Sequence, residues 1–114
     1  MATNRPIKFV ASGFSSPADD FAQQALDLNK FLVKHPASTF FMRNQTNANQ
    51  KYGILEGDIL IIDRSLKPSS NRLNLIISDD EFKVTDEDGL SKLLKERNSD
   101  SEFWGVIISI IRKF

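Results

Sequence analysis

From residue 39 onward, the chain alternates short runs of β-branched and aromatic residues with polar turn segments. Side chains of these kinds pack well on a pleated surface, so each run predicts a β-strand. The segment 58–63 is apolar between its two terminal acids, which is typical of a buried strand. Asp79 and Asp80 separate two runs so closely that they predict a hairpin. The predicted strands are residues 39–42, 58–63, 73–77, 81–85 and 103–111.

Helix signals concentrate in the N-terminal third of the chain. Asp27 can cap a helix over residues 28–34, because its carboxylate can accept hydrogen bonds from first-turn amides. Pro36 ends that segment, since the residue before a proline disfavours helical geometry. Ser16 followed by Pro17 predicts an earlier helix start of the same kind.

A further helix is predicted between the last two strands. Leucines at positions 90, 93 and 94 have helical spacing, with charged residues between and after them. Helical segments first and mostly strands afterwards indicate a mainly β or α+β fold in one domain. We expect residues 1–13 to form a short N-terminal arm and residues 14–114 to form the folded domain.

Composition excludes several kinds of site. The 114 residues contain fifteen basic and fifteen acidic side chains, so nothing indicates the clustered positive charge that drives nucleic-acid binding. There is no cysteine, which excludes disulfides and thiolate-bound metals, and His35 is the single histidine. We therefore expect no cofactor and no metal. The apolar runs fall far short of the ~20 residues of a membrane helix. The N-terminus lacks an apolar signal core, so we expect a cytoplasmic protein.

Two stretches carry a specific pattern. The first begins with Ser-Gly-Phe-Ser-Ser-Pro-Ala-Asp-Asp-Phe at residues 12–21 and continues through Leu-Asp-Leu-Asn at 26–29 to His-Pro-Ala-Ser-Thr at 35–39. The second is Gly-Ile-Leu-Glu-Gly-Asp-Ile-Leu-Ile-Ile-Asp-Arg-Ser at residues 53–65. Together they closely resemble the LexA/UmuD family of Ser–Lys autoproteases. The similarity is close over residues 9–85 and looser in the C-terminal strand.

The resemblance implies a compact β fold like the C-terminal domain of LexA and UmuD, with a peptide-binding cleft. In that family, RecA bound to single-stranded DNA stimulates cleavage of the N-terminal arm between a small residue and a glycine. Ser12 and Gly13 stand at that position here. The resemblance also implies a homodimer, or a heterodimer with a UmuD-type relative, with a UmuC-type polymerase and the RecA filament as partners. It implies no direct binding to nucleic acid or membrane.

The resemblance places the family's nucleophilic serine at Ala48 and its basic lysine at Thr85. A serine hydroxyl attacks only when a neighbouring base takes its proton. Ala48 has no atom to attack with, and Thr85 has no basic nitrogen. Losing one member of such a unit removes most of the catalysis, so we expect no peptidase activity. The chain is predicted to act by binding, in the SOS response to DNA damage or in translesion synthesis.

Two alternatives stay open. Thr46 and Lys83 each lie two residues before a lost dyad position, and a displaced Thr46–Lys83 dyad would make the chain a self-cleaving protease. The fold could instead serve as a repurposed regulatory interaction domain that is unrelated to a polymerase. The sequence also departs from the family where Asn71-Arg72 replaces a Gly-Asp turn. The interval between Thr85 and Trp104 is too short for the family's additional strand pair.

The remaining candidate residues have simpler interpretations. His35 is interpreted as a loop or partly buried histidine, and Glu56 and Asp58 as turn residues. The acidic segment 86–88 is expected to cap the following helix. Arg112 is expected to mark the solvent-exposed end of the last strand. The aromatic side chains expected in the core or in a dimer interface are Phe40, Phe41, Phe103 and Trp104.

Overall fold

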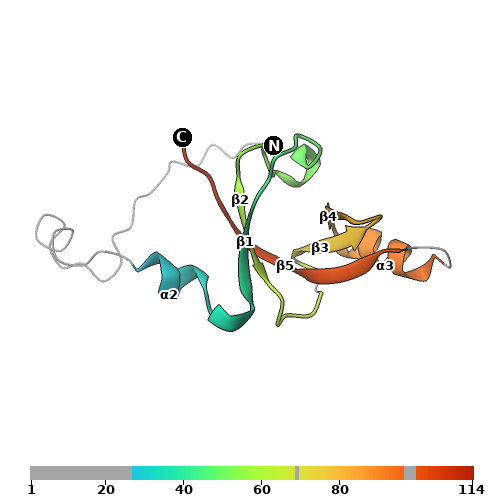
Figure 1. The fold of residues 1–114 in the computed structure, drawn as a ribbon, viewed down its shortest axis with the longest axis horizontal. Helices are drawn as coiled ribbons and strands as arrows, with labels where there is room; N and C mark the ends of the chain where they lie inside the picture. The colour runs from blue at the N-terminus through green and yellow to red at the C-terminus, as the bar shows by residue number, and fades with distance from the viewer. Residues whose placement is uncertain (1–26, 69, 97–99) are drawn as a thin grey trace, which may run out of the picture.

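The computed structural model describes residues 27–68, 70–96 and 100–114. They form one five-stranded antiparallel sheet with the strand order β1-β2-β5-β3-β4 (Figure 1). The predicted mainly β fold with short helices is confirmed. The elements are α2 (Leu28–Leu32), η1 (Pro36–Ser38), β1 (Thr39–Arg43), η2 (Gln50–Tyr52), β2 (Ile59–Asp63), β3 (Leu73–Ser78), β4 (Glu81–Thr85), α3 (Glu87–Lys95) and β5 (Glu102–Ile111).

The long strand β5 joins the two halves of the sheet. Its N-terminal half pairs with β3 and its C-terminal half pairs with β2. The pairing register skips Trp104 on the β3 side and Ile108 on the β2 side. Extra residues of this kind are bulges, which bend a strand and re-aim side chains. The β1–β2 pair accordingly runs in a different direction from the β3–β4 pair, and β5 connects the two (Figure 1).

The main core lies on one face of this bent sheet. Its fully enclosed side chains come from three strands and from the segment before β2: Ile54, Leu60, Ile62, Leu75 and Ile107. Trp104 and Val84 pack against the cluster. At Gly105, an added Cβ would lie 2.5 Å from Cγ2 of Ile62, so this close approach of β5 to β2 requires glycine.

The edge strand β1 holds two aromatic residues that were expected in the core or in an interface. Phe40 is 43% exposed and Phe41 is 53% exposed, so the core assignment is wrong for both. The reason is their position, because β1 pairs on one side only and its side chains have few neighbours within the described part of the chain. Trp104, by contrast, packs on the core as expected.

Both described α-helices begin where the capping signals predicted. The carboxylate of Asp27 accepts a hydrogen bond from the Lys30 amide at 3.3 Å, and α2 ends two residues before the predicted boundary. The carboxylate of Asp86 accepts from the Gly89 amide at 2.7 Å, which confirms the predicted acidic cap of α3. The helix α3 packs against β3 and β4 and buries Leu90. The predicted hairpin at Asp79-Asp80 is confirmed by the β3–β4 pairing.

Several sequence predictions lie outside the described residues. They are the N-terminal arm over residues 1–13, the Ser12-Gly13 bond and the helix start at Ser16-Pro17. Within the residues that are described, none of the helices has the length and apolar character needed to span a bilayer.

Candidate functional site

A groove runs between the loop that follows β1 and the edge strand β4. It consists of two adjoining hollows of about 250 and 410 Å³, and both are lined by Thr46, Asn49, Phe82 and Val84. We call it the loop–β4 groove. Its lining residues are Met42, Arg43, Asn44, Gln45, Thr46, Ala48, Asn49, Lys51, Tyr52, Leu60, Leu75, Glu81, Phe82, Lys83 and Val84.

Three of the four predicted dyad positions line this groove, and the fourth does not. Ala48, Thr46 and Lys83 all line the larger hollow. Thr85 directly follows the lining residue Val84, but it is not part of the lining. It is only 6% exposed and lies beneath α3, where a Cβ added to Gly89 would be 2.1 Å from its hydroxyl oxygen. The position that the resemblance assigns to the lysine is therefore covered by a helix.

The groove offers little that could activate a nucleophile. Ala48 presents only a methyl group, and its amide donates a hydrogen bond to Oγ1 of Thr46 at 3.1 Å. Lys83 is exposed, and so is Lys51, which also lines the groove. A lysine becomes a base near neutral pH only when burial removes its hydration. Among the groove residues that the structure describes, no amine meets that condition.

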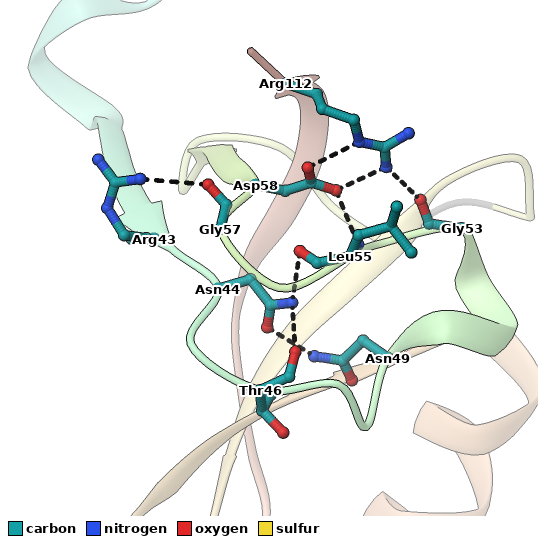
Figure 2. Close-up of polar contacts among 9 residues, drawn as sticks. All are labelled: Arg43, Asn44, Thr46, Asn49, Gly53, Leu55, Gly57, Asp58 and Arg112. Carbon is teal, nitrogen blue, oxygen red and sulfur yellow. Dashed lines mark hydrogen bonds and ion pairs between the residues drawn. The ribbon is translucent and has the colours of Figure 1, made fainter. Parts of the chain in front are cut away.

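The loop wall of the groove is organised around Asn44, which is buried (Figure 2). Its side-chain amide donates to the carbonyl oxygens of Thr46 at 2.8 Å and Leu55 at 2.9 Å. Its side-chain oxygen accepts from the amide of Asn49 at 3.1 Å. Residues 45–48 of this loop are exposed, whereas Asn44 points into the protein. A fully hydrogen-bonded amide can be buried at low cost and fixes the loop around it.

A second polar cluster ties this loop to the end of β5. Arg112 donates through Nε to Oδ1 of Asp58 at 2.8 Å and through Nη2 to Oδ2 at 2.7 Å. Nη2 also donates to the Gly53 carbonyl oxygen at 2.9 Å, and the Leu55 amide donates to Oδ2 of Asp58 at 2.7 Å (Figure 2). The hydrogen bonds from Arg112, and then from Leu55, lower the pKa of Asp58 from 3.8 to about 2. The same pair raises the pKa of Arg112.

This pair corrects the sequence interpretation of both residues. Asp58 is 2% exposed rather than a solvated turn residue, and Arg112 is an ion-pair partner rather than only a strand-end marker. The signal that could have found the pair is the register. Because Ile59 lies opposite Ile111 in antiparallel pairing, the next residues outward, Asp58 and Arg112, also face each other.

Aromatic rings extend from β1 to β4 beside the groove. Trp104 makes edge-to-face contacts with Phe40, at a centroid distance of 5.3 Å, and with Phe82, at 5.2 Å. The guanidinium of Arg64 lies 4.2 Å from the Trp104 ring centroid, which is a cation–π geometry. The bulge at Trp104 allows one side chain to link the two edge strands of the sheet.

His35 has a partner that the sequence did not reveal. Its Nδ1 lies 2.6 Å from Oδ2 of Asp63, which is 1% exposed. The interpretation of His35 as a simple loop histidine is therefore incomplete. Within the described residues, no cluster of three or more His, Asp or Glu side chains is suited to a metal ion.

The chain is similar to three named bacterial proteins. Protein ImpA of Escherichia coli, like ImpA of Salmonella typhimurium, is 41% identical over 73 residues, which cover 64% of this chain and 50% of ImpA. Protein SamA of Salmonella typhimurium is 36% identical over 64% of this chain and 52% of SamA. Protein MucA of Escherichia coli is 29% identical over 89% of this chain and 78% of MucA. No family model matches the chain.

The similarity to ImpA, SamA and MucA, which are UmuD-family members, supports a UmuD-like family for this chain. The chain spans about half the length of ImpA and SamA, which are the relatives with the higher identities. The resemblance seen in residues 12–65 is therefore supported by matches that cover 64–89% of this chain, and the groove contains Ala48, the position to which the resemblance assigns the nucleophile.

Proposed function

We propose that this UmuD-like chain binds an extended peptide segment in the loop–β4 groove without cleaving it, and acts in the SOS response or in translesion synthesis. The observation that carries the proposal is which side chains stand at positions 48 and 85. The resemblance assigns the nucleophile position to Ala48, which presents a methyl group to the groove, and the lysine position to Thr85, which lies under α3. These two features support binding without cleavage.

The groove is suited to an extended segment because the edge strand β4 lines one side and the edge strand β1 runs into the loop that lines the other. Backbone hydrogen bonds join the Arg64 amide to the Ser38 carbonyl and the Asn44 amide to the Asp58 carbonyl. In an antiparallel pair, every second residue bonds to the partner strand. Because residues 38 and 44 bond to the residues that flank β2, the backbone N–H and C=O groups of residues 39, 41 and 43 point away from β2. A free strand edge of this kind can pair with an added strand, while side chains such as Met42, Phe82 and Val84 accept alternate residues of that strand.

The occupant that we propose is the segment 6–13, from the same chain or from a partner. This proposal includes a homodimer, or a heterodimer with a UmuD-type relative that retains its dyad. It also includes a UmuC-type polymerase and the RecA filament as partners of the assembled form. Two observations support this proposal: the sequence similarity to UmuD-like proteins, and a formal net charge of zero, which disfavours direct DNA binding.

A displaced Thr46–Lys83 dyad is the second candidate function. In its favour, both residues line the same hollow. Against it, Lys83 is exposed and keeps its hydration, and Oγ1 of Thr46 already accepts a hydrogen bond from the Ala48 amide. The third hypothesis is a repurposed interaction domain. It also has a peptide bound in the groove, but it predicts no association with a lesion-bypass polymerase or with RecA.

The decisive test of the catalytic question is a cleavage assay. The full chain is incubated with RecA, single-stranded DNA and ATP, and intact mass is followed beside a UmuD-family protein that retains the Ser–Lys dyad. We expect the control to be cut and this chain to give no fragment beginning at Gly13. A fragment that disappears in the Lys83→Ala variant would establish the displaced dyad instead.

The binding question is tested with a fluorescent peptide of residues 4–16 added to the full chain. We expect saturable anisotropy, weakened by Phe82→Ala and by Ala48→Trp, which fills the larger hollow. The matched control is Lys92→Ala on α3, which does not line the groove. Absence of saturable binding, or equal loss in the control, contradicts the proposed peptide site.

A further inference from the structure

A separate hollow of about 260 Å³ lies between the α2 segment, β2 and β5. We propose that this hollow binds an oxyanion, either a carboxylate or a phosphate, that is carried on an apolar group. We call it the His35 pocket, and the residues that carry the argument are His35, Asp63, Lys34, Arg72, Phe31 and Ile108. It shares no lining residue with the loop–β4 groove, so this inference does not depend on the proposed function.

The carboxylate in the pocket is already satisfied by the protein. Oδ2 of Asp63 is bonded to Nδ1 of His35 at 2.6 Å, and Oδ1 accepts from the amide of Ser65 at 2.8 Å and from its hydroxyl at 2.6 Å. Burial alone would raise the pKa of Asp63, but the hydrogen bonds from Ser65 and His35 outweigh it and lower that pKa. Asp63 therefore acts as an internal anchor whose oxygens are occupied by protein donors.

This anchor orients the imidazole of His35. A carboxylate accepts hydrogen bonds, so Nδ1 is the donor and Nε2 is the ring nitrogen left for a ligand. The His35 side chain is 51% exposed, which makes its free edge accessible. With Nδ1 bonded to Asp63, the Nε2 edge of the ring is the part of His35 that can contact an anion. The buried carboxylate of Asp63 thus turns a surface histidine into a fixed recognition group.

Two further cations line the same pocket. Neither Lys34 nor Arg72 forms an ion pair with any carboxylate in the described part of the chain. Lys34 uses one donor on the Lys30 carbonyl oxygen at 3.2 Å and retains others, while the guanidinium of Arg72 can bind an oxyanion through two parallel bonds. Two cations therefore share the lining with one carboxylate that His35 and Ser65 already engage, so the lining favours an anion.

The rest of the lining is apolar and specifies the remainder of the ligand. Phe31 is 60% exposed on α2, a helix that contains no buried residue. Ile108 lines the pocket from the bulge of β5, where the register shift re-aims its side chain. A ligand with an apolar body would cover these surfaces while its anionic group contacts the cations. The C-terminal carboxylate of a peptide, an aliphatic acid and an organic phosphate share this chemistry.

The single histidine of the chain makes a direct test possible, because its ring protons give one set of NMR signals. The full chain at fixed pH is titrated with N-acetylphenylalanine, with hexanoate and with hexyl phosphate. The neutral controls are N-acetylphenylalanine amide and hexanol. We expect a saturable shift of the His35 ring signals with at least one anion and none with its neutral counterpart. The anion that binds most tightly identifies the source as peptide terminus, aliphatic acid or phosphate ester.

Two substitutions then test the cations. We expect Arg72→Gln and Lys34→Gln each to weaken the apparent affinity by roughly three- to tenfold, the range of partly exposed charge contacts. Lys92→Gln on α3 removes the same charge away from the pocket and should leave the affinity unchanged. Unmoved His35 signals, equal shifts with neutral probes, or equal weakening by Lys92→Gln would overturn the proposal.

Discussion

Arg112 and Asp58 form a bidentate ion pair that joins the ends of two neighbouring strands, with nitrogen–oxygen distances of 2.8 and 2.7 Å. Arg112 follows β5, and Asp58 precedes β2. The pair also reaches the Gly53 carbonyl and the Leu55 amide, so it fixes the loop that forms one wall of the groove. A contact between residues 54 positions apart in the chain thus sets the geometry of the candidate site.

This pair predicts a specific acid sensitivity. The folded-state pKa of Asp58 is about 2, below its ordinary 3.8, so its contribution to stability is present above pH 4 and is lost as pH falls toward 2. The pKa of Asp63 is also lowered and acts in the same direction. We expect the melting temperature to fall steeply between about pH 4 and pH 2.

The variant Arg112→Gln tests the cause of this sensitivity. Without the guanidinium, the pKa of Asp58 returns toward its ordinary value, and the variant should be less stable than the native chain at pH 7. That difference should shrink as the pH falls from 4 toward 2, because Asp58 then becomes protonated in the native chain as well. Thermal melts across pH 2–7 measure this, with Lys113→Gln as the charge-matched control. A constant difference at every pH would contradict the assignment.

Substitution of Asn74 by valine should stabilise the protein. Asn74 is fully buried, and neither its side-chain nitrogen nor its oxygen has a hydrogen-bond partner among the described residues. A buried amide without partners costs about 1–3 kcal/mol, so Asn74→Val should raise the unfolding free energy by about 1–2 kcal/mol. Chemical denaturation measures the change.

Asn44 provides the matched comparison, because it is the same residue type but fully hydrogen-bonded. Asn44→Ala leaves the carbonyl oxygens of Thr46 and Leu55 without this donor and should cost about 2–3 kcal/mol. The two asparagines are therefore expected to respond with opposite signs. Destabilisation by Asn74→Val would show that its side chain is satisfied in solution.

The turn of the β3–β4 hairpin holds two aspartates in a strained backbone conformation. Asp79 and Asp80 have φ values of 54° and 64°, a left-handed geometry that glycine adopts more easily than aspartate. Asp80→Gly should therefore stabilise the protein by about 0.5–1 kcal/mol. Lys92→Gly, in the interior of α3, should lower stability by a similar amount because helical geometry penalises glycine. A loss of stability in Asp80→Gly would contradict the strained-turn assignment.

Placing the dyad residues that the resemblance implies at positions 48 and 85 should not produce cleavage. In the variant Ala48→Ser with Thr85→Lys, the new lysine must fit beneath α3, where Gly89 already packs against Thr85. We expect no fragment beginning at Gly13 in the presence of RecA and single-stranded DNA. We also expect a stability loss of about 1–3 kcal/mol from overpacking.

The single variant Ala48→Ser is the control for that experiment. Ala48 is exposed, so this change should alter stability by less than about 0.5 kcal/mol. Cleavage by the double variant would show that α3 moves aside readily and that only the two dyad side chains had been lost.

Local sequence patterns predicted the strands and caps well. Runs of β-branched and aromatic residues gave every described strand to within one residue at each boundary, because side-chain packing on a pleat depends on neighbours along the chain. Asp27 and Asp86 were also recognisable, since a cap interacts with amides only a few residues away. The exposure of the aromatic residues of β1 could not be predicted locally, because it depends on where that strand lies in the sheet.

By itself, the sequence determined the elements of this protein, its UmuD-like character and the residue types at positions 48 and 85. Only the tertiary structure decided that Asp58 pairs with Arg112, that His35 pairs with Asp63, and that α3 covers Thr85. The physical reason is distance along the chain. Local propensities act over a few neighbouring residues, whereas these contacts require the strand order and register that place distant residues together.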